Sequence, residues 1–131
     1  GSPAMNFLGG KISGISDQTI EFELENQQKI QIPCQPGEQA KAGSSAKAGV
    51  RPEHLELTGD SDAILQGKVF AVERLGGETY LYVQTEDYKE LTVHSSGDKV
   101  ISVDDLVSIG FSMENCHLFN GQGQVFDKLA A

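Results

Sequence analysis

Alternation of apolar and polar residues is the clearest pattern along the chain. Every second residue of TIEFELE (residues 19–25) is apolar, which is typical of a β-strand with one wet face. KIQI follows after a polar NQQ and alternates in the same way, so residues 19–32 are predicted to form a β-hairpin. LVSIGF (residues 106–111) repeats the alternation and predicts a further strand.

Two other segments, residues 67–73 and 79–84, are apolar or aromatic on both faces. They are therefore predicted to form central strands whose two faces are both covered by other parts of the protein. The GGE turn at residues 76–78 would join them. No window keeps apolar residues at helical spacing over three turns, so the predicted class is all-β with at most one-turn helices. Among the aromatic residues, we expect Phe22, Phe70 and Phe111 in the core and Tyr80, Tyr82 and Tyr88 at an interface.

The chain also contains an internal repeat. LGGKI at residue 8 resembles LQGKV at residue 65, an offset of 57, and AGVRPEHLEL at residue 48 aligns with IGFSMENCHLF at residue 109, an offset of 61. This predicts two related β-units, about 6–58 and 63–127, within one region spanning 1–131. Two small barrel-like halves and one interleaved sandwich both fit the repeat.

One part of the first repeat has a weak pattern. QPGEQAKAGSSAKAG (residues 35–49) contains no large apolar residue. It predicts a mobile surface loop and a short or missing strand before Gly49.

Composition and charge limit the possible functions. The 131 residues are 38% apolar and 22% charged, which fits one folded region. The net charge is −9 and no segment gathers basic residues, so nucleic-acid binding is disfavoured. The apolar runs are far shorter than the ~20 residues of a membrane helix, and the opening GSPAMNFLGG lacks a signal-peptide pattern. We interpret Cys34 and Cys116 as reduced cytosolic thiols.

Motifs of catalysis or nucleotide binding are not found. No GxxxxGK[ST] loop occurs, and His54, His94 and His117 have neither a GxSxG serine nor an obvious thiolate partner. Cys116 and His117 supply only half of the four ligands of a structural zinc, so an ordinary strand position is favoured. We therefore expect no catalytic, cofactor-binding or metal site.

GVRPEHLEL (residues 49–57) predicts a corner. Pro52 fixes its own backbone and pushes Arg51 into an extended conformation, and a proline suits the first position of one helical turn. Glu53 then lies in the first turn, where negative charge is favoured. The segment is either a fixed corner between strands or a surface from which Arg51, Glu53 and His54 project toward a partner.

Four ordered motifs together resemble a known family: GSPAMNFL, GVRPEHLEL, LGGETYLYV and IGFSMENCHLFNGQG. They resemble the C-terminal regulatory region, of transport-associated OB (TOBE) type, of the ATPase subunits of ABC importers for sugars and glycerol 3-phosphate. The resemblance runs from residue 1 to about residue 126 and implies an OB-like β-barrel without catalytic activity of its own. In that family GSPxMNFL follows the ATPase domain, which would hold ATP and Mg. SMEN, which replaces a PER-type turn, and the alanine-rich stretch before Gly49 depart from the family pattern.

The resemblance also implies partners and a location. The partners would be a second copy in the ATPase dimer, the chain's own N-terminal ATPase domain, the membrane subunits reached through that domain, and a cytosolic regulatory protein. The place would be the cytoplasm, at the inner face of the membrane. An oxyanion-binding or oligosaccharide-binding OB-type module is the alternative. By motif match, the expected dimer or regulatory contacts are Arg51, Pro52, Glu53, His54, Gly77, Glu78, Thr79, Tyr80, Gly110, Glu114, His117 and Phe119.

Overall fold

Two antiparallel sheets make up the fold. The computed structural model describes residues 4–96 and 100–129, and within them the chain forms ten strands and two single-turn 3₁₀ helices. The strand orders are β10-β4-β1-β2-β3 and β5-β9-β6-β7-β8. The expected all-β class with at most one-turn helices is confirmed for this part of the chain. The first three residues of the opening GSPAMNFL motif lie outside the described residues.

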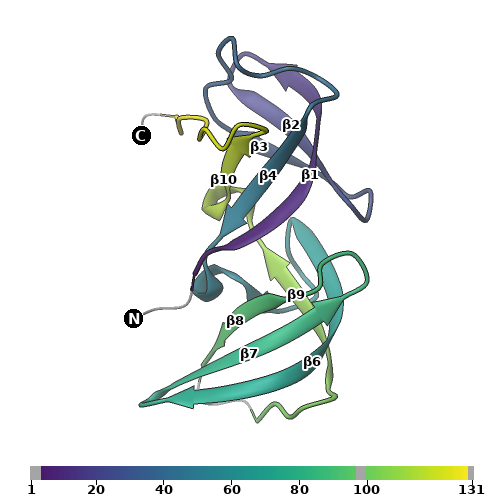
Figure 1. Ribbon diagram of the computed structural model, residues 1–131, viewed down its shortest axis with the longest axis vertical. Coiled ribbons are helices and arrows are strands. Elements are labelled where there is room, and N and C mark those ends of the chain that lie inside the picture. Colours follow the sequence, from purple (N-terminus) through teal and green to yellow (C-terminus); the bar gives the residue numbers. More distant parts are fainter. Residues whose placement is uncertain (1–3, 97–99, 130–131) are drawn as a thin grey trace. The chain divides into compact units, whose positions relative to one another are not determined.

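The first sheet forms a compact unit, here called the β1 unit, which comprises Phe7–Val50 and the residues from Met113 onward (Figure 1). The 3₁₀ helix η2 (Met113–Asn115) precedes the last strand and contacts the opposite edge strand, so the sheet curls into a barrel-like form. The fully buried side chains include Leu8, Ile12, Ile20 and Phe22. The strands are β1 (Asn6–Ser16), β2 (Thr19–Leu24), β3 (Lys29–Pro33), β4 (Ser45–Val50) and β10 (His117–Asn120).

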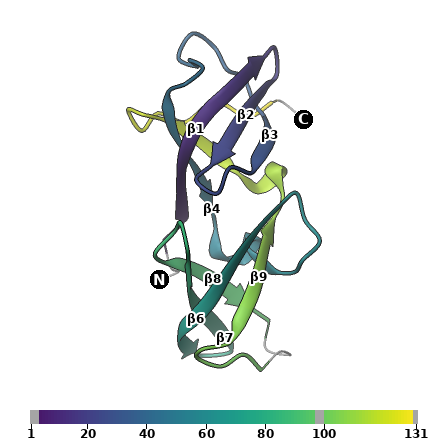
Figure 2. The same cartoon turned by 90° about the vertical axis from the view of Figure 1, so that its right-hand side faces the viewer.

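The second sheet forms the β6 unit, which comprises the residues up to Asn6 and Arg51–Ser112 (Figure 2). Its edge strands β5 and β8 contact each other, and the 3₁₀ helix η1 (Pro52–His54) contacts β8, so this sheet is barrel-like as well. Val69, Leu81 and Val83 are fully buried. The strands are β5 (Glu56–Leu57), β6 (Ala63–Leu75), β7 (Glu78–Thr85), β8 (Leu91–Ser95) and β9 (Leu106–Phe111).

Two backbone features recur in both units at the offsets of the sequence repeat. The β1–β2 register shifts between Ile12 and Gly14, and the β6–β7 register shifts between Val69 and Ala71, an offset of 57 residues. Each shift is a β-bulge, in which one extra residue stands in one strand. The turns before β4 and β9 are also alike, since Gly43 has φ +86° and Asp104, an offset of 61, has φ +76°.

Each unit takes its last strand from the other repeat. β10 pairs with β4 through His117↔Gly49, and β5 pairs with β9 through Glu56↔Gly110. The two pairings are equivalent at an offset of 61. The expected segments 6–58 and 63–127 stay a prediction about sequence repeats, because the compact units follow different boundaries.

The prediction of a short or missing strand before Gly49 is wrong. β4 is a six-residue strand that lies between β10 and β1 in its sheet. Ala46 and Ala48 are 3% and 0% exposed, and Val50 is fully buried. The alternation is present, but two of its buried residues are alanines, whose weak hydrophobicity hides the strand in the sequence.

The prediction of two fully covered strands is also wrong. Phe70 is the extra residue of the β6 bulge and is 44% exposed, so it is not part of the core. Phe22 and Phe111 are buried as expected. Tyr80 and Tyr88 are each 7% exposed, and therefore only Tyr82, which is half-buried, fits the expectation of an accessible tyrosine.

Cys34 and Cys116 are both buried and are not joined in a disulfide. Burial raises the pKa of the Cys34 thiol, because a thiolate is poorly solvated inside the protein. Across residues 4–96 and 100–129, no helix has the length and apolar character needed to cross a membrane.

Candidate functional site

The Pro52 corner has the predicted conformation. Arg51 is extended, with φ −71° and ψ 150°, and Pro52 begins η1. The His54 amide donates to the Arg51 carbonyl oxygen at 2.9 Å and closes the turn. Pro52 is buried, whereas Arg51 and Glu53 are exposed. The corner is thus anchored by its proline and presents both charged side chains to solvent.

Three polar side chains meet where β7 begins beside β8. The Tyr80 hydroxyl donates to Glu78 Oε2 at 2.8 Å, and His94 Nε2 lies 3.8 Å from Glu78 Oε1. The Tyr80 and His94 rings pack edge to face with centroids 5.2 Å apart. Together with Glu53 of the corner, they form what we call the Glu78 cluster: Glu53, Glu78, Tyr80 and His94.

Electrostatics keep Tyr80 protonated. The pKa of Tyr80 is raised, first by its hydrogen bond to Glu78, then by burial, and then by the charges of Glu78 and Glu53. Tyr80 therefore acts as a hydrogen-bond donor and not as a base.

Among the described residues, no group of three or more His, Cys, Asp or Glu side chains could hold a metal ion.

A cavity of about 320 Å³ opens beside this cluster. Glu53 and Glu56 contribute carboxylates to its wall, and His94 and Ser95 contribute further polar groups. Two carboxylates oppose the binding of an anion. This wall therefore fits a polar or cationic group better than an oxyanion.

The other expected contact residues of the β6 unit differ in burial and in hydrogen bonding. Thr79 is 9% exposed and accepts a hydrogen bond from the Arg74 guanidinium at 3.3 Å. Gly110 is buried, and a Cβ atom there would lie 2.6 Å from Ser61 Cβ. Gly77 is exposed in the turn between β6 and β7. His54 is half-buried, and its buried Nδ1 has no hydrogen-bond partner among the described residues.

The remaining expected residues lie in the β1 unit. Glu114 is exposed in η2, where its carbonyl oxygen accepts a hydrogen bond from Lys128 Nζ at 2.8 Å. His117 begins β10, and the Phe119 ring packs edge to face on Phe7 with centroids 5.6 Å apart. The twelve positions thus divide into nine in the β6 unit and three in the β1 unit, and their role in contacts stays a prediction.

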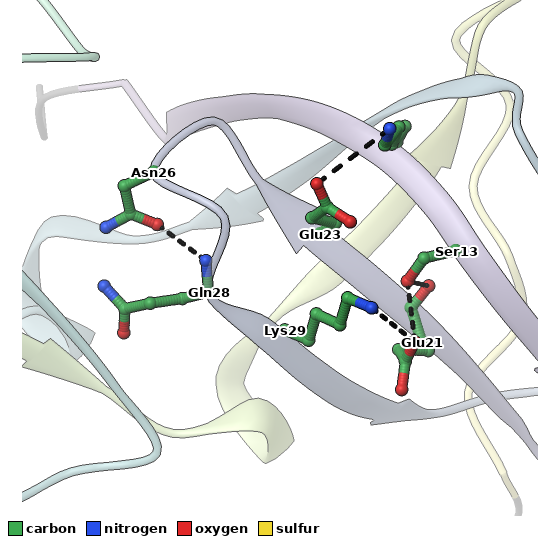
Figure 3. A network of polar contacts seen from close by, with 7 residues as sticks. Ser13, Glu21, Glu23, Asn26, Gln28 and Lys29 are labelled. Atoms are coloured by element: carbon green, nitrogen blue, oxygen red, sulfur yellow. Dashed lines mark hydrogen bonds and ion pairs between the residues drawn. The ribbon is translucent and has the colours of Figure 1, made fainter.

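Sequence reasoning missed two features. His94 was considered only as a catalytic candidate, whereas it joins the Glu78 cluster through its pairing with Tyr80 across β7 and β8. A polar network on the β1 unit was also missed (Figure 3). In it, Glu21 accepts hydrogen bonds from Ser13 Oγ at 2.9 Å and Gln31 Nε2 at 2.6 Å. The alternation of TIEFELE indicates its outward position but not its partners.

Comparisons with known proteins agree with the fold. The model of the TOBE domain matches residues 48–119, and that of the MalK OB fold domain matches residues 1–55. A maltose/maltodextrin import ATP-binding protein, MalK, from Yersinia pestis bv. Antiqua (strain Antiqua) is 34% identical over 98% of this chain. MalK from Salmonella typhi is 35% identical over the same share. The chain spans 35% of the length of each relative.

A solved structure with low sequence identity has the same fold. The cytoplasmic molybdate-binding protein ModG, with molybdate bound, aligns with a TM-score of 0.73 at 17% identity. The alignment covers 86% of this chain and 94% of that one. At this identity the likeness concerns the fold alone.

Proposed function

The chain belongs to the TOBE domain family, and from that premise we propose that it is the regulatory and dimerisation region of the ATP-binding subunit of an ABC importer. The matching models are those of OB and TOBE domains, and neither is an ATPase domain, so the chain itself is non-catalytic. The proposed cargo of the complete importer is a sugar or glycerol 3-phosphate.

One observation carries the proposal. Identity of 34% extends over 98% of this chain but over only 35% of the length of a maltose/maltodextrin import ATP-binding protein. The rest of such a relative has no counterpart in the chain, and we assign binding of ATP and Mg to that part. The chain's own role is then to connect proteins, which fits a scaffold whose described residues include no metal-binding group.

The proposed partners follow from this role. They are a second copy of the chain in the ATPase dimer, the ATPase domain of the same subunit, the membrane subunits reached through that domain, and a cytosolic regulator. The proposed location is the inner face of the cell membrane. The exposed Arg51 and Glu53 of the corner and Gly77 and Glu78 of the β6–β7 turn are accessible to such partners.

Deletion within the complete subunit tests the proposal. The subunit with and without residues 1–131 is compared by analytical ultracentrifugation and by ATP hydrolysis in the assembled importer. Loss of this region is expected to weaken the dimer and to change the coupling of hydrolysis to transport. A truncated subunit that dimerises and hydrolyses ATP as the complete one does would refute the proposal. The isolated chain alone is a weaker test, since a small interface can be too weak to hold without the ATPase domains.

A second candidate function is the binding of a small ligand. It is favoured by the fold shared with the molybdate-binding protein ModG. The net charge of −9 and the carboxylates of Glu53 and Glu56 in the cavity oppose it for an anion. Calorimetry with molybdate, sulfate, glycerol 3-phosphate and maltose tests this alternative. The absence of any heat of binding would eliminate it.

A further inference from the structure

The two equivalent bulges carry different kinds of side chain, polar in the β1 unit and aromatic in the β6 unit. Ser13 is the extra residue of the β1 bulge, and it hydrogen-bonds to Glu21 on β2 (Figure 3). At the equivalent positions of the β6 unit, Phe70 and Tyr82 place their ring centroids 6.4 Å apart. The same site in the scaffold is therefore a satisfied polar network in one unit and an aromatic pair in the other.

An exposed leucine lies on the same face of the sheet as the aromatic pair. Phe70 is 44% exposed and Leu106 is 81% exposed. Leu106 pairs with Lys68 across β6 and β9, and because residues two apart in a strand share a face, Lys68 and Phe70 lie on the same side of the sheet. We call Phe70, Tyr82 and Leu106 the aromatic patch. Its two most exposed side chains have no polar group that could bond to water, so their burial by a partner would be favourable.

Acidic residues lie near the aromatic patch. The Tyr82 hydroxyl donates to Glu73 Oε1 at 3.0 Å. The pKa of Tyr82 is raised, first by this bond, then by burial, and then by the charges of Glu73 and Glu90. Asp104 and Asp105 lie next to Leu106 in the chain and hydrogen-bond through their backbones to Val69, the neighbour of Phe70. Lys68 is basic and lies on the same face as Phe70.

The net charge of the whole β6 unit also favours a cationic partner. Of the residues assigned to the β6 unit, twelve are acidic and five are basic, a net charge of −7, whereas the β1 unit has seven acidic and five basic residues, a net charge of −2. Most of the total of −9 therefore lies in the unit that carries the aromatic patch. A cationic partner segment is therefore attracted to this unit.

We propose that the aromatic patch is a docking site for a segment of a partner protein that presents an arginine or a lysine beside an apolar side chain. The apolar side chain would cover Phe70 and Leu106. The cation would lie against the Tyr82 ring and pair with the nearby carboxylates, a combination to which a guanidinium is suited. This inference deepens the proposed docking role and rests on it, and it names both the surface and the chemistry of the partner.

Titration of the 131-residue chain with a short peptide tests the inference. The probe is acetyl-Arg-Leu-Arg-amide, and the matched control is acetyl-Glu-Leu-Glu-amide, with backbone amide chemical shifts as the readout. The basic peptide is expected to shift the amides of residues 68–73, 82 and 104–106, and its affinity should fall as salt is added. The acidic peptide should leave these amides unchanged. Equal shifts with both peptides, or shifts at other positions only, would overturn the inference.

A pair of variants separates the patch from exposed aromatic area in general. Phe70→Ser is expected to weaken binding of the basic peptide about tenfold, which corresponds to the loss of one well-placed contact. Phe7→Ser is the matched control, because Phe7 is 53% exposed and packs on Phe119, whose cross-strand neighbour is Lys47. That variant should bind the peptide as the parent does. Equal weakening by both variants would contradict the inference, as would self-association of the chain that Phe70→Ser abolishes.

The outcome is distinguishable from failure of the proposed function. In the complete subunit, Phe70→Ser should leave dimerisation and ATP hydrolysis unchanged, because the patch is assigned to a different partner. Removal of residues 1–131 should impair both. If the peptide binds and the deletion has no effect, the proposed function fails and the patch stands. If the deletion acts and the peptide does not bind, only the patch is refuted.

Discussion

The Asn6 side chain makes two hydrogen bonds to the backbone of Thr92. Its Nδ2 donates to the Thr92 carbonyl oxygen at 2.8 Å, and its Oδ1 accepts from the Thr92 amide at 2.7 Å. Thr92 lies in β8, which is an edge strand of its sheet. The side chain therefore takes the place of a missing neighbouring strand and satisfies both backbone groups. This gives a structural role to the asparagine of the MNFL motif.

Replacement of Asn6 should destabilise the β6 unit. Asn6→Ala removes both hydrogen bonds at a side chain that is 7% exposed, and the expected loss is about 1–3 kcal/mol in the free energy of unfolding. Urea denaturation monitored by circular dichroism measures it. Asn6→Asp keeps the acceptor but sets a carboxylate oxygen against the Thr92 carbonyl oxygen, so at neutral pH it should destabilise the unit at least as much as Asn6→Ala does. Unchanged stability in Asn6→Ala would mean that the pairing does not contribute.

Substitution of Gly110 distinguishes packing from partner contact. A Cβ atom at this position would lie 2.6 Å from Ser61 Cβ and 2.8 Å from Thr58 Cγ2. Gly110→Ala should therefore lower the stability of the isolated chain by about 1–3 kcal/mol through overpacking. Gly59→Ala is the control, because its Cβ would meet nothing within 4 Å. If Gly110→Ala were as stable as the parent, the glycine would be free to serve a partner contact.

Sequence reasoning predicted the parts of the fold that depend on local pattern. The β2–β3 hairpin, the Pro52 corner and the turn between β6 and β7 each follow from alternation or from a glycine or proline at a turn. The repeat was visible because the two offsets, 57 and 61, are carried by glycines and apolar residues that the bulge and the strand pairing require. The hairpin, the corner and the turn depend only on residues that are close to one another in the sequence.

Features set by distant residues were not predictable from the pattern. Phe70 reads as a core position, but it is the extra residue of the β6 bulge and is 44% exposed. Tyr80 reads as an interface residue, but Glu78 and His94 enclose it. β4 depends on the pairing with β10, which lies at the other end of the sequence. In each case the exposure or pairing of the residue depends on a contact with another strand, and alternation within one short segment does not reveal that contact.

Glu21 should titrate below its ordinary range. Its pKa is lowered from 4.5, first by the hydrogen bond from Ser13, then by that from Gln31. Because the folded pKa is below the unfolded one, this contribution to stability is full above about pH 4.5 and is lost as the pH falls through the folded value. Carboxyl carbon NMR over pH 2–6 measures the titration.

Variants identify the cause of the Glu21 shift. Ser13→Ala should raise the pKa of Glu21 toward 4.5, and Gln31→Ala should raise it by a smaller amount, since its hydrogen bond is the second cause. A Glu21 pKa that does not respond to Ser13→Ala would place the cause elsewhere.

The exchanged strands predict that neither half of the sequence folds alone. Cleavage between Gly59 and Asp60 gives fragments 1–59 and 60–131, and the first lacks β10, the partner of β4. Without residues 60–131, the apolar side chains of Leu118 and Phe126, which are 2% and 1% exposed, are missing from the β1 unit. The hydrophobic stabilisation lost with these side chains is large compared with the few kcal/mol of free energy that separate folded from unfolded chains.

Amide NMR spectra distinguish the possible outcomes. Fragment 1–59 should give the narrow dispersion of an unfolded chain, and an equimolar mixture of the two fragments should recover the dispersed spectrum of the intact protein. As a matched control, residues 7–50 joined by a Gly-Ser linker to residues 113–131 should fold alone, because this chain contains all five strands of its sheet. A folded spectrum from fragment 1–59 alone would show that the first repeat is self-sufficient and that the exchange is dispensable.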